Sequence, residues 1–220
     1  MINLLVSVLV FAVNVLYRDR PYPRFYVLET VARVPYFSYL SVLHLYETLG
    51  WWRKADWLKV HFAQSWNELH HLLIMEALGG DKFWGDRLLA RTAALLYYWI
   101  IVFTYFISSK AAYRFMERIE EHAYRSYDRF LAKHASALQL QPAPAIALSY
   151  YRDGDLYLFD EFQTARVAAE RRPRIENLYD VFLAIRDDEM EHVKTMRACQ
   201  QPHAQSSIKS PHAFPSTPAR

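Results

Sequence analysis

The stretch Trp66–His71 (WNELHH) decides the fold that this sequence specifies. Glu68 and His71 stand three residues apart, so a helix through this stretch places both side chains on one face. The same Glu-x-x-His step returns as Glu189–His192 (EMEH). In carboxylate-bridged di-iron and di-manganese bundles, two helices carry this motif and two further helices each contribute one Glu. The two motifs therefore predict a four-helix bundle around a metal site.

Two lone glutamates within apolar helical patterns supply the remaining carboxylates. Glu29 lies on the same helical stripe as Phe25 and Leu43, and Glu120 lies on a stripe with Met116. Burying four carboxylates and two imidazoles without compensation would cost more than a marginally stable domain can offset. We therefore expect a dinuclear metal site with the ligands Glu29, Glu68, His71, Glu120, Glu189 and His192.

The composition narrows the fold and the metal. With 220 residues, of which 53% are hydrophobic and only five are glycine, the chain favours a single all-α domain. The formal net charge is +3 and no Lys/Arg-rich tract occurs, so nucleic acid is a poor partner, whereas an anionic membrane surface fits. Cys199 is the only cysteine, which excludes an intrachain disulfide and a thiolate metal site. Carboxylate and imidazole ligands suit iron or manganese.

Proline and glycine divide the chain into helices. Pro21 marks the start of the first bundle helix, and Pro35 is expected to kink it. Gly50 and the pair Gly79-Gly80 mark the ends of two helices. Residues 141–174 hold several prolines and are expected to be irregular. The predicted helices cover residues 21–49, 56–78, 86–110, 111–135 and 175–199.

Two uncharged segments point to a membrane. Residues 1–17 lack the basic start and the small-residue cleavage site of a signal peptide, so we expect an N-terminal helix over residues 1–20 that lies on or partly in a membrane. Residues 92–109 are long enough to span a bilayer, but a single span would put Glu68 and Glu120 on opposite sides of it. We therefore expect a helix in the membrane interface, with a buried core helix as the alternative.

These elements give a complete fold prediction. Residues 21–200 form the helical domain, and residues 201–220 form a mostly disordered tail. The predicted class is an all-α four-helix di-iron bundle with a ferritin-like ligand arrangement. Two additional membrane-interface helices and an irregular segment before the last helix complete it.

Several motifs of this chain resemble those of the alternative oxidases. They are LETVARVP at 28–35, NELHHL at 67–72, EEHAYRSY at 120–127 and RDDEMEH at 186–192. The segments DGDLYLFDEF at 153–162 and RPRIENLYD at 172–180 are similar to the plastid branch, the plastoquinol terminal oxidases. The resemblance covers about residues 21–200. No transit peptide precedes it, so we expect a version encoded where its thylakoid membrane already lies, in a photosynthetic prokaryote or plastid.

The resemblance implies a non-haem di-iron quinol oxidase that is monotopic in the membrane and homodimeric. Its carboxylate-bridged pair of iron ions would oxidise two plastoquinols per O2 and form water without pumping protons. The six ligands named above match the iron ligands of the family. Tyr127 matches the tyrosine that lies near the irons in this family. His44, Tyr105 and Asp188 match other positions that the family requires for function. The residues that match its quinol pocket are Arg24, Leu28, Ile119, Ala123 and Ser126.

The residue types suggest roles at some of these positions. Tyr127, about two turns from Glu120, could relay an electron and a proton, although a buried tyrosine is more often a core residue. Asp188 and His44 would orient metal ligands through hydrogen bonds, with a salt bridge to an arginine as the alternative for Asp188. Arg24 would donate a hydrogen bond to a quinol oxygen. Two other functions stay open: a di-iron hydroxylase or desaturase that acts on a membrane lipid or quinone, and a ferritin-like iron-binding protein.

Overall fold

The computed structural model describes residues 13, 15–51, 55–154 and 172–201 of the chain. Within these residues every regular element is a helix, which confirms the predicted all-α class. The elements are α2 (Pro21–Ala32), α3 (Val34–Thr48), α4 (Ala55–Ala77), α5 (Trp84–Ile107), α6 (Ser109–Gln139), α7 (Ala145–Leu148), the π-helical turn η1 (Ser149–Asp153) and α8 (Leu178–Cys199).

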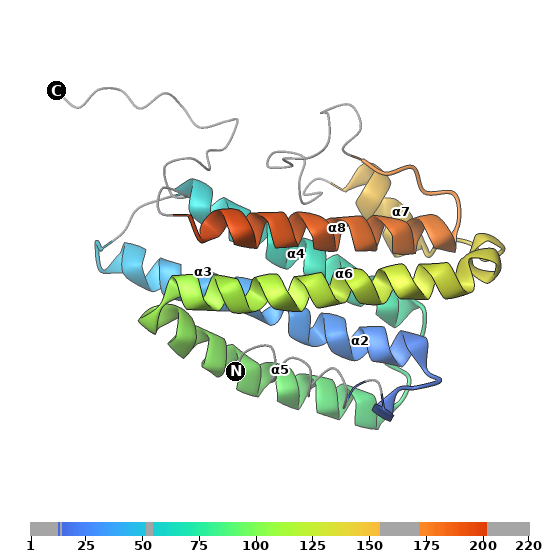
Figure 1. The fold of residues 1–220 in the computed structure, drawn as a ribbon, viewed down its shortest axis with the longest axis horizontal. Helices are drawn as coiled ribbons and strands as arrows, with labels where there is room; N and C mark the ends of the chain where they lie inside the picture. The colour runs from blue at the N-terminus through green and yellow to red at the C-terminus, as the bar shows by residue number, and fades with distance from the viewer. Residues whose placement is uncertain (1–12, 14, 52–54, 155–171, 202–220) are drawn as a thin grey trace.

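Four helical rods form the bundle, and one of them consists of α2 followed by α3. The helices α6 and α8 run side by side in opposite directions, and α2 continues into α3 beneath them (Figure 1). The helix α4 packs against both α2 and α3, and α5 covers the same two helices from the outer side of the bundle. The helices α2, α4, α6 and α8, which carry the predicted ligands, therefore surround one interior.

The first rod breaks at Arg33, as Pro35 predicted. A prolyl nitrogen carries no hydrogen, so Pro35 cannot bond to the carbonyl oxygen of Val31 in the way that a continuous helix requires. The backbone N–H of Arg33 still makes the helical bond to the carbonyl oxygen of Glu29, at 3.4 Å, but the regular helix ends at Ala32 and resumes at Val34 with Pro35 in its first turn. The predicted kink is confirmed.

Glycine ends two of the helices in the left-handed backbone conformation. Gly50 follows α3 with a φ of 71°, and Gly79 follows α4 with a φ of 80°. The N–H of Gly79 donates to the carbonyl of Glu76 at 2.8 Å, and that of Gly80 donates to the carbonyl of Met75 at 2.9 Å. This pair of bonds is a Schellman motif, in which a side chain with a Cβ would be strained. Both predicted helix ends are confirmed.

Other boundaries differ from the prediction by a few residues, among them α6, which ends at Gln139 and not at residue 135, and in two places a polar side chain caps the helix. α5 ends at Ile107, before the predicted residue 110, since Ser108 has an extended backbone. The Ser108 hydroxyl oxygen accepts the N–H of Ala111 at 3.2 Å and so starts α6. α8 begins at Leu178 and not at residue 175, because Asn177 forms a capping box with the residue three positions further on.

The segment predicted to be irregular is partly helical. Both α7 and η1 fold within it, and η1 buries Tyr150 and Tyr151 against the bundle. The predictions for the N-terminal helix, the tail and the rest of this segment fall largely on residues outside the described part, which are 1–12, 14, 155–171 and 202–220.

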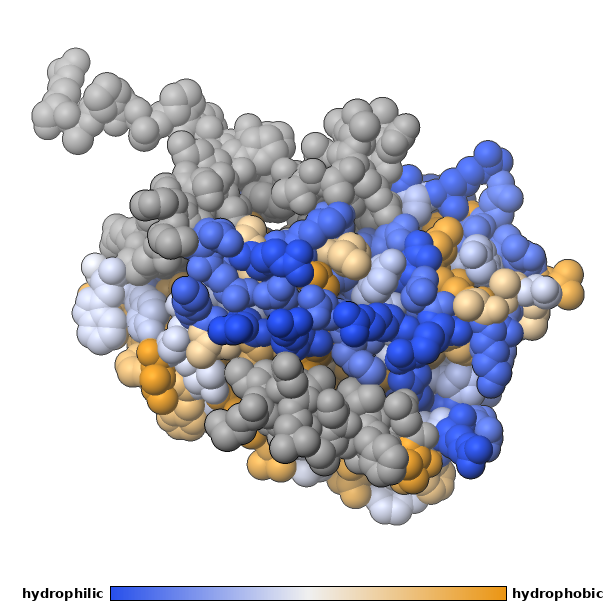
Figure 2. Space-filling view, viewed as in Figure 1, coloured by the Kyte–Doolittle hydropathy of each residue, from blue (hydrophilic) through white to orange (hydrophobic). Residues whose placement is uncertain are grey.

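The outward side of α5 is a broad apolar face. Its side chains Trp84, Leu95, Trp99, Phe103 and Ile107 are 53–84% exposed. Hydrophobic residues gather along the edge of the molecule where α5 lies, whereas the face over α6 and α8 is hydrophilic (Figures 1 and 2). By length and composition α5 could cross a membrane, and only 17% of its most apolar window is buried in the protein. The alternative that this segment is a buried core helix is therefore wrong.

Candidate metal centre

Six buried side chains converge in the middle of the bundle, and none is more than 2% exposed. They are Glu29 from α2, Glu68 and His71 from α4, Glu120 from α6, and Glu189 and His192 from α8. These are the six side chains that the sequence singled out as ligands. Their ligand atoms form two groups within 4.8 Å, Glu29/Glu68/His71/Glu189 and Glu68/Glu120/His192. Because Glu68 belongs to both groups, the cluster has the form of two adjacent cation sites that share a carboxylate.

Seven polar atoms of this cluster lack a hydrogen-bond partner. In the described residues nine buried side-chain nitrogen or oxygen atoms have no hydrogen-bond partner, and seven of them belong to Glu29, Glu68, His71, Glu120 and Glu189. The Nδ1 atom of His71 faces three carboxylates at once, at 3.3 Å from Glu189, 3.7 Å from Glu29 and 4.0 Å from Glu68. Buried polar atoms are normally satisfied, so this arrangement fits a site for cations.

The electrostatics of the metal-free cluster lead to the same conclusion. Burial, followed by repulsion from the neighbouring carboxylates, raises the pKa of Glu68 and of Glu120 well above the ordinary value. Burial alone would lower the pKa of His71, but the carboxyl groups of Asp188, Glu189 and Glu29 around its two nitrogens outweigh burial and raise it well above its ordinary value. Protons therefore neutralise the metal-free site where metal cations would otherwise do so.

The donor set fits two divalent cations of the iron or manganese type. Four carboxylates balance the charge of two such ions, and the two imidazoles add neutral donors. No thiolate takes part, because the single cysteine, Cys199, lies outside both groups.

A buried hydrogen-bond network contacts His71 on the side away from the carboxylates and His192 on the side of the cluster. The Oδ2 atom of Asp188 lies 3.3 Å from Nε2 of His71, which leaves Nδ1 of that ring facing the carboxylates. The amide of Asn67 donates to the same Oδ2 atom at 3.0 Å, and its oxygen lies 2.9 Å from Nε2 of His192. The hydroxyl of Tyr151 donates to Asp188 at 3.1 Å. Asn67 thus links the surroundings of one histidine to those of the other.

Two tyrosines donate hydrogen bonds to metal-facing carboxylates. The hydroxyl of Tyr127 donates to Oε1 of Glu29, and the hydroxyl of Tyr36 donates to Oε1 of Glu120. Burial and then the charge of the bonded glutamate raise the pKa of each tyrosine well above its ordinary value. The Tyr127 ring is held by Phe25, with 4.3 Å between ring centroids and 9° between ring planes.

The sequence model for the family described as "Alternative oxidase" matches residues 4–201. The chain belongs to the alternative oxidase family. "Ubiquinol oxidase 4, chloroplastic/chromoplastic" of Arabidopsis thaliana is 62% identical over 201 residues, which cover 91% of this chain and 56% of that protein. "Alternative oxidase 3, mitochondrial" of Glycine max is 32% identical over 167 residues, which cover 76% of this chain and 45% of that protein. The chain thus spans about half the length of these relatives.

In this alternative oxidase the five predicted quinol-contact residues lie on two neighbouring helices, α2 and α6. The Arg24 guanidinium donates to Oγ of Ser126 at 3.4 Å, and its Nε atom is buried without a hydrogen-bond partner. Leu28, Ile119 and Ala123 are half-buried on the same pair of helices. Among these five residues, the contact between Arg24 and Ser126 joins the two helices.

Two predicted site residues lie away from the centre. Tyr105 is buried near the end of α5, with its hydroxyl 2.6 Å from that of Tyr113. His44 is exposed on α3. The helix passes the centre at Tyr36, and the eight residues that follow carry His44 about 12 Å further along the axis, where Leu43 and not His44 faces inward. The expectation that His44 orients a metal ligand by a hydrogen bond is therefore wrong.

Several residues that support the site were missed by sequence reasoning. Asn67 directly precedes Glu68 on α4, and its only signal in the sequence is one more polar residue in a helix that already has a polar stripe with His61 and Gln64. Tyr150 and Tyr151 had no such signal, because they lie in a segment bounded by prolines whose path depends on tertiary packing.

Proposed function

We propose that this chain is a membrane-bound, non-haem di-iron quinol oxidase that uses the electrons of two quinols to reduce one O2 to two waters. The observation that carries this proposal is the buried cluster of four carboxylates and two imidazoles from four helices of an alternative oxidase. The name of the Arabidopsis relative, a chloroplastic ubiquinol oxidase, supports a quinol substrate and a plastid-type membrane. Plastoquinol is the proposed quinol, the thylakoid membrane the proposed location, and a homodimer the proposed assembly.

The six clustered side chains would hold the two iron ions. Glu29, His71 and Glu189 would bind one ion, Glu120 and His192 the other, and Glu68 would lie between them. When bound, the pair of irons supplies the redox chemistry that O2 reduction requires.

The surrounding side chains would set the protonation of the ligands. Asp188 accepts the Nε2 proton of His71 and so keeps the Nδ1 lone pair directed at the metal site. Tyr127 holds its hydroxyl proton against Glu29 at rest, since its pKa is raised by burial and by that carboxylate. This hydroxyl is a buried proton and electron donor in contact with a ligand, and it is the proposed catalytic group.

The quinol would bind where α2 meets α6. The unpartnered Nε of Arg24 offers a hydrogen bond to a quinol oxygen. Burial, aided by nearby arginines, lowers the pKa of His122 to about 4, so its ring is neutral beside Ser126, at 3.2 Å. A neutral imidazole is able to accept a hydrogen bond from a quinol hydroxyl.

The placement of α5 supports attachment to one leaflet. This helix lies between α4 and α6 in the chain, and both contribute carboxylates, Glu68 and Glu120, to one cluster. A helix that crossed the bilayer once would separate them. Immersion of the exposed apolar face in the interface, with Arg87, Arg91 and Lys110 near its ends, satisfies both observations.

Oxygen uptake by the purified, iron-loaded protein in liposomes tests the proposal. We expect uptake that depends on quinol, with two quinols consumed per O2, and faster turnover with a plastoquinol analogue than with a ubiquinol analogue. Glu189→Ala should abolish uptake, whereas Glu176→Ala, at an exposed site, should not. An oxygenated lipid or quinone detected by mass spectrometry would indicate a hydroxylase instead, and assembly into large soluble iron-filled cages would indicate a ferritin-like protein.

A further inference from the structure

A buried chain of hydrogen bonds connects His192 with the far end of α5. Gln64 Nε2 lies 3.4 Å from His192 Nδ1, and its oxygen lies 3.0 Å from His61 Nδ1. His61 Nε2 lies 2.8 Å from the Tyr113 hydroxyl, which lies 2.6 Å from that of Tyr105. All five side chains are at most 3% exposed. We call Gln64, His61, Tyr113 and Tyr105 the His192 chain.

Each link of this chain can run in either of two directions, because hydroxyl, amide and neutral imidazole groups both donate and accept. In the inward direction Tyr105 donates to Tyr113, which donates to Nε2 of His61. The Nδ1–H of His61 then donates to the oxygen of Gln64, whose nitrogen donates to Nδ1 of His192. In the outward direction every one of these links is reversed, with the same number of protons in the chain.

All hydrogen bonds of the His192 chain run in the same direction, inward or outward. Burial lowers the pKa of His61 to about 4, so its ring is neutral and carries one proton. That ring therefore donates at one nitrogen and accepts at the other. The Gln64 amide likewise presents its oxygen to one neighbour and its nitrogen to the other. The indole N–H of Trp57 donates to the Tyr113 hydroxyl at 3.0 Å in both directions, so Tyr113 has one proton to give.

Metal binding at His192 selects the outward direction. The Nε2 atom of His192 faces the cluster, 3.2 Å from Oε1 of Glu68 and 2.9 Å from the side-chain oxygen of Asn67, so in the metal-free protein it carries the ring proton. A bond to a metal needs the lone pair of Nε2, so the single ring proton must sit on Nδ1 and must be donated to Gln64. The structure, with the Gln64 nitrogen toward His192, has the inward arrangement.

We propose that Gln64, His61, Tyr113 and Tyr105 are positioning residues of the metal centre. We propose further that metal binding at His192 reverses the direction of every hydrogen bond in the His192 chain. This inference rests on the proposed dinuclear site. In the outward direction Tyr105 is the last acceptor, because its hydroxyl oxygen accepts the hydrogen bond from Tyr113. The hydroxyl proton of Tyr105 then no longer donates to Tyr113.

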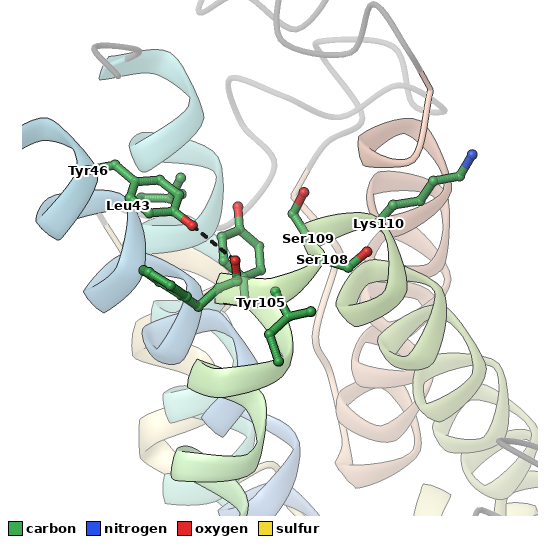
Figure 3. Close-up of a pocket in the computed structure, with 8 residues that line it drawn as sticks. Leu43, Tyr46, Tyr105, Ser108, Ser109 and Lys110 are labelled. Atoms are coloured by element: carbon green, nitrogen blue, oxygen red, sulfur yellow. Dashed lines mark hydrogen bonds between the residues drawn. The ribbon is translucent and has the colours of Figure 1, made fainter. Parts of the chain in front are cut away.

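Tyr105, the last residue of the His192 chain, is one of the residues around a cavity at the end of α5. Tyr105 lines this cavity of about 280 Å³ together with Leu43, Tyr46 and Lys110, where the end of α3 faces the turn from α5 to α6 (Figure 3). The His192 chain thus ends at a residue that lines a cavity remote from the six clustered side chains.

The tautomer of His61, which touches no ligand, reports the reversal directly. We expect ¹⁵N NMR of histidine-labelled protein to show His61 protonated at Nδ1 in the metal-free state and at Nε2 after two equivalents of Zn²⁺, with the signal assigned by its loss in His61→Gln. The same His61 tautomer in both states would overturn the proposal. Should the wild-type protein bind fewer than two Zn²⁺ ions, the dinuclear site itself fails, and this inference fails with it.

A matched pair of variants gives a second test. In Tyr105→Phe the outward direction leaves the Tyr113 proton without an acceptor, so we expect the weaker of the two Zn²⁺ equivalents to bind roughly tenfold less tightly. Tyr98→Phe, on the same helix, removes only a hydroxyl that donates to Ser41 at 3.1 Å and should bind both equivalents as the wild type does. Wild-type binding of both equivalents by Tyr105→Phe would overturn the role assigned to Tyr105.

Discussion

The substitution Asp188→Asn removes one negative charge from behind the metal site while preserving shape. The Oδ2 atom of Asp188 accepts hydrogen bonds from Asn67 at 3.0 Å and Tyr151 at 3.1 Å, and it lies 3.3 Å from Nε2 of His71. A buried hydrogen bond to a charged group contributes about 1.5–3 kcal/mol, and about 1.4 kcal/mol corresponds to a tenfold change in affinity. We therefore expect the metal ion at His71 to bind about 10–100-fold more weakly, the range found for groups that orient metal ligands.

Anaerobic titration with Fe²⁺ against a competing chelator measures this loss. Asp187→Asn is the matched control, because Asp187 is the adjacent residue and its partly exposed carboxylate pairs with Arg186 at 2.7 Å. We expect Asp187→Asn to bind two equivalents as the wild type does, and both variants to keep the wild-type helical circular dichroism. The reasoning is refuted if folded Asp188→Asn binds both irons with wild-type affinity, or if Asp187→Asn loses as much affinity as Asp188→Asn.

The buried cluster, the tyrosine beside it and the apolar face of α5 each lead to a measurable prediction. Because the pKa values of Glu68 and Glu120 are raised above 4.5, the folded metal-free protein holds more protons than the unfolded chain above that pH, and its stability falls as pH rises. Buried histidines with lowered pKa values oppose this effect only below about pH 6.5. The Tm of the metal-free protein should therefore fall between about pH 6.5 and 8, whereas the Tm of the iron-loaded protein should not. A Tm of the metal-free protein that rises over this range contradicts the direction of these pKa shifts. Tyr127→Phe should lower quinol oxidase turnover by about 10²–10⁴-fold at unchanged iron content, whereas loss of iron with unchanged turnover per iron would make the hydroxyl purely structural. Phe103→Asp, at a side chain that is 62% exposed, should weaken binding to liposomes by about tenfold or more in a flotation assay and leave activity in detergent intact; unchanged flotation argues against immersion of this face.

The ligand set was predictable because a helix imposes its own geometry. Glu68 and His71 are three residues apart, so they must share a face once the segment is helical. The position of Glu29 in an apolar stripe indicated that its side chain is buried. The helix ends at Gly50 and Gly79 were predictable for a similar local reason, since the left-handed conformation strongly favours glycine there.

Features that depend on packing between distant segments escaped prediction. Tyr151 reaches Asp188 from a π-helical turn inside a segment that local breakers marked as irregular. Asn67 connects two histidines on different helices, and nothing in the local pattern of α4 reveals its partners. For His44 the sequence predicted a role that the structure does not support. A match to a position that the family requires does not say which way the side chain faces along α3, and His44 is exposed.

Iron stoichiometry, read together with the Mössbauer spectrum, tests the convergence of the six side chains most directly. Glu120 and Glu121 are adjacent on α6, but Glu120 is buried in the cluster and Glu121 pairs with Arg118 at 2.9 Å on the surface. We expect two spin-coupled irons per chain in the wild type and in Glu121→Gln, and no coupled pair in Glu120→Gln. A coupled pair retained in Glu120→Gln, or a wild-type protein that never binds two irons, would contradict the dinuclear centre.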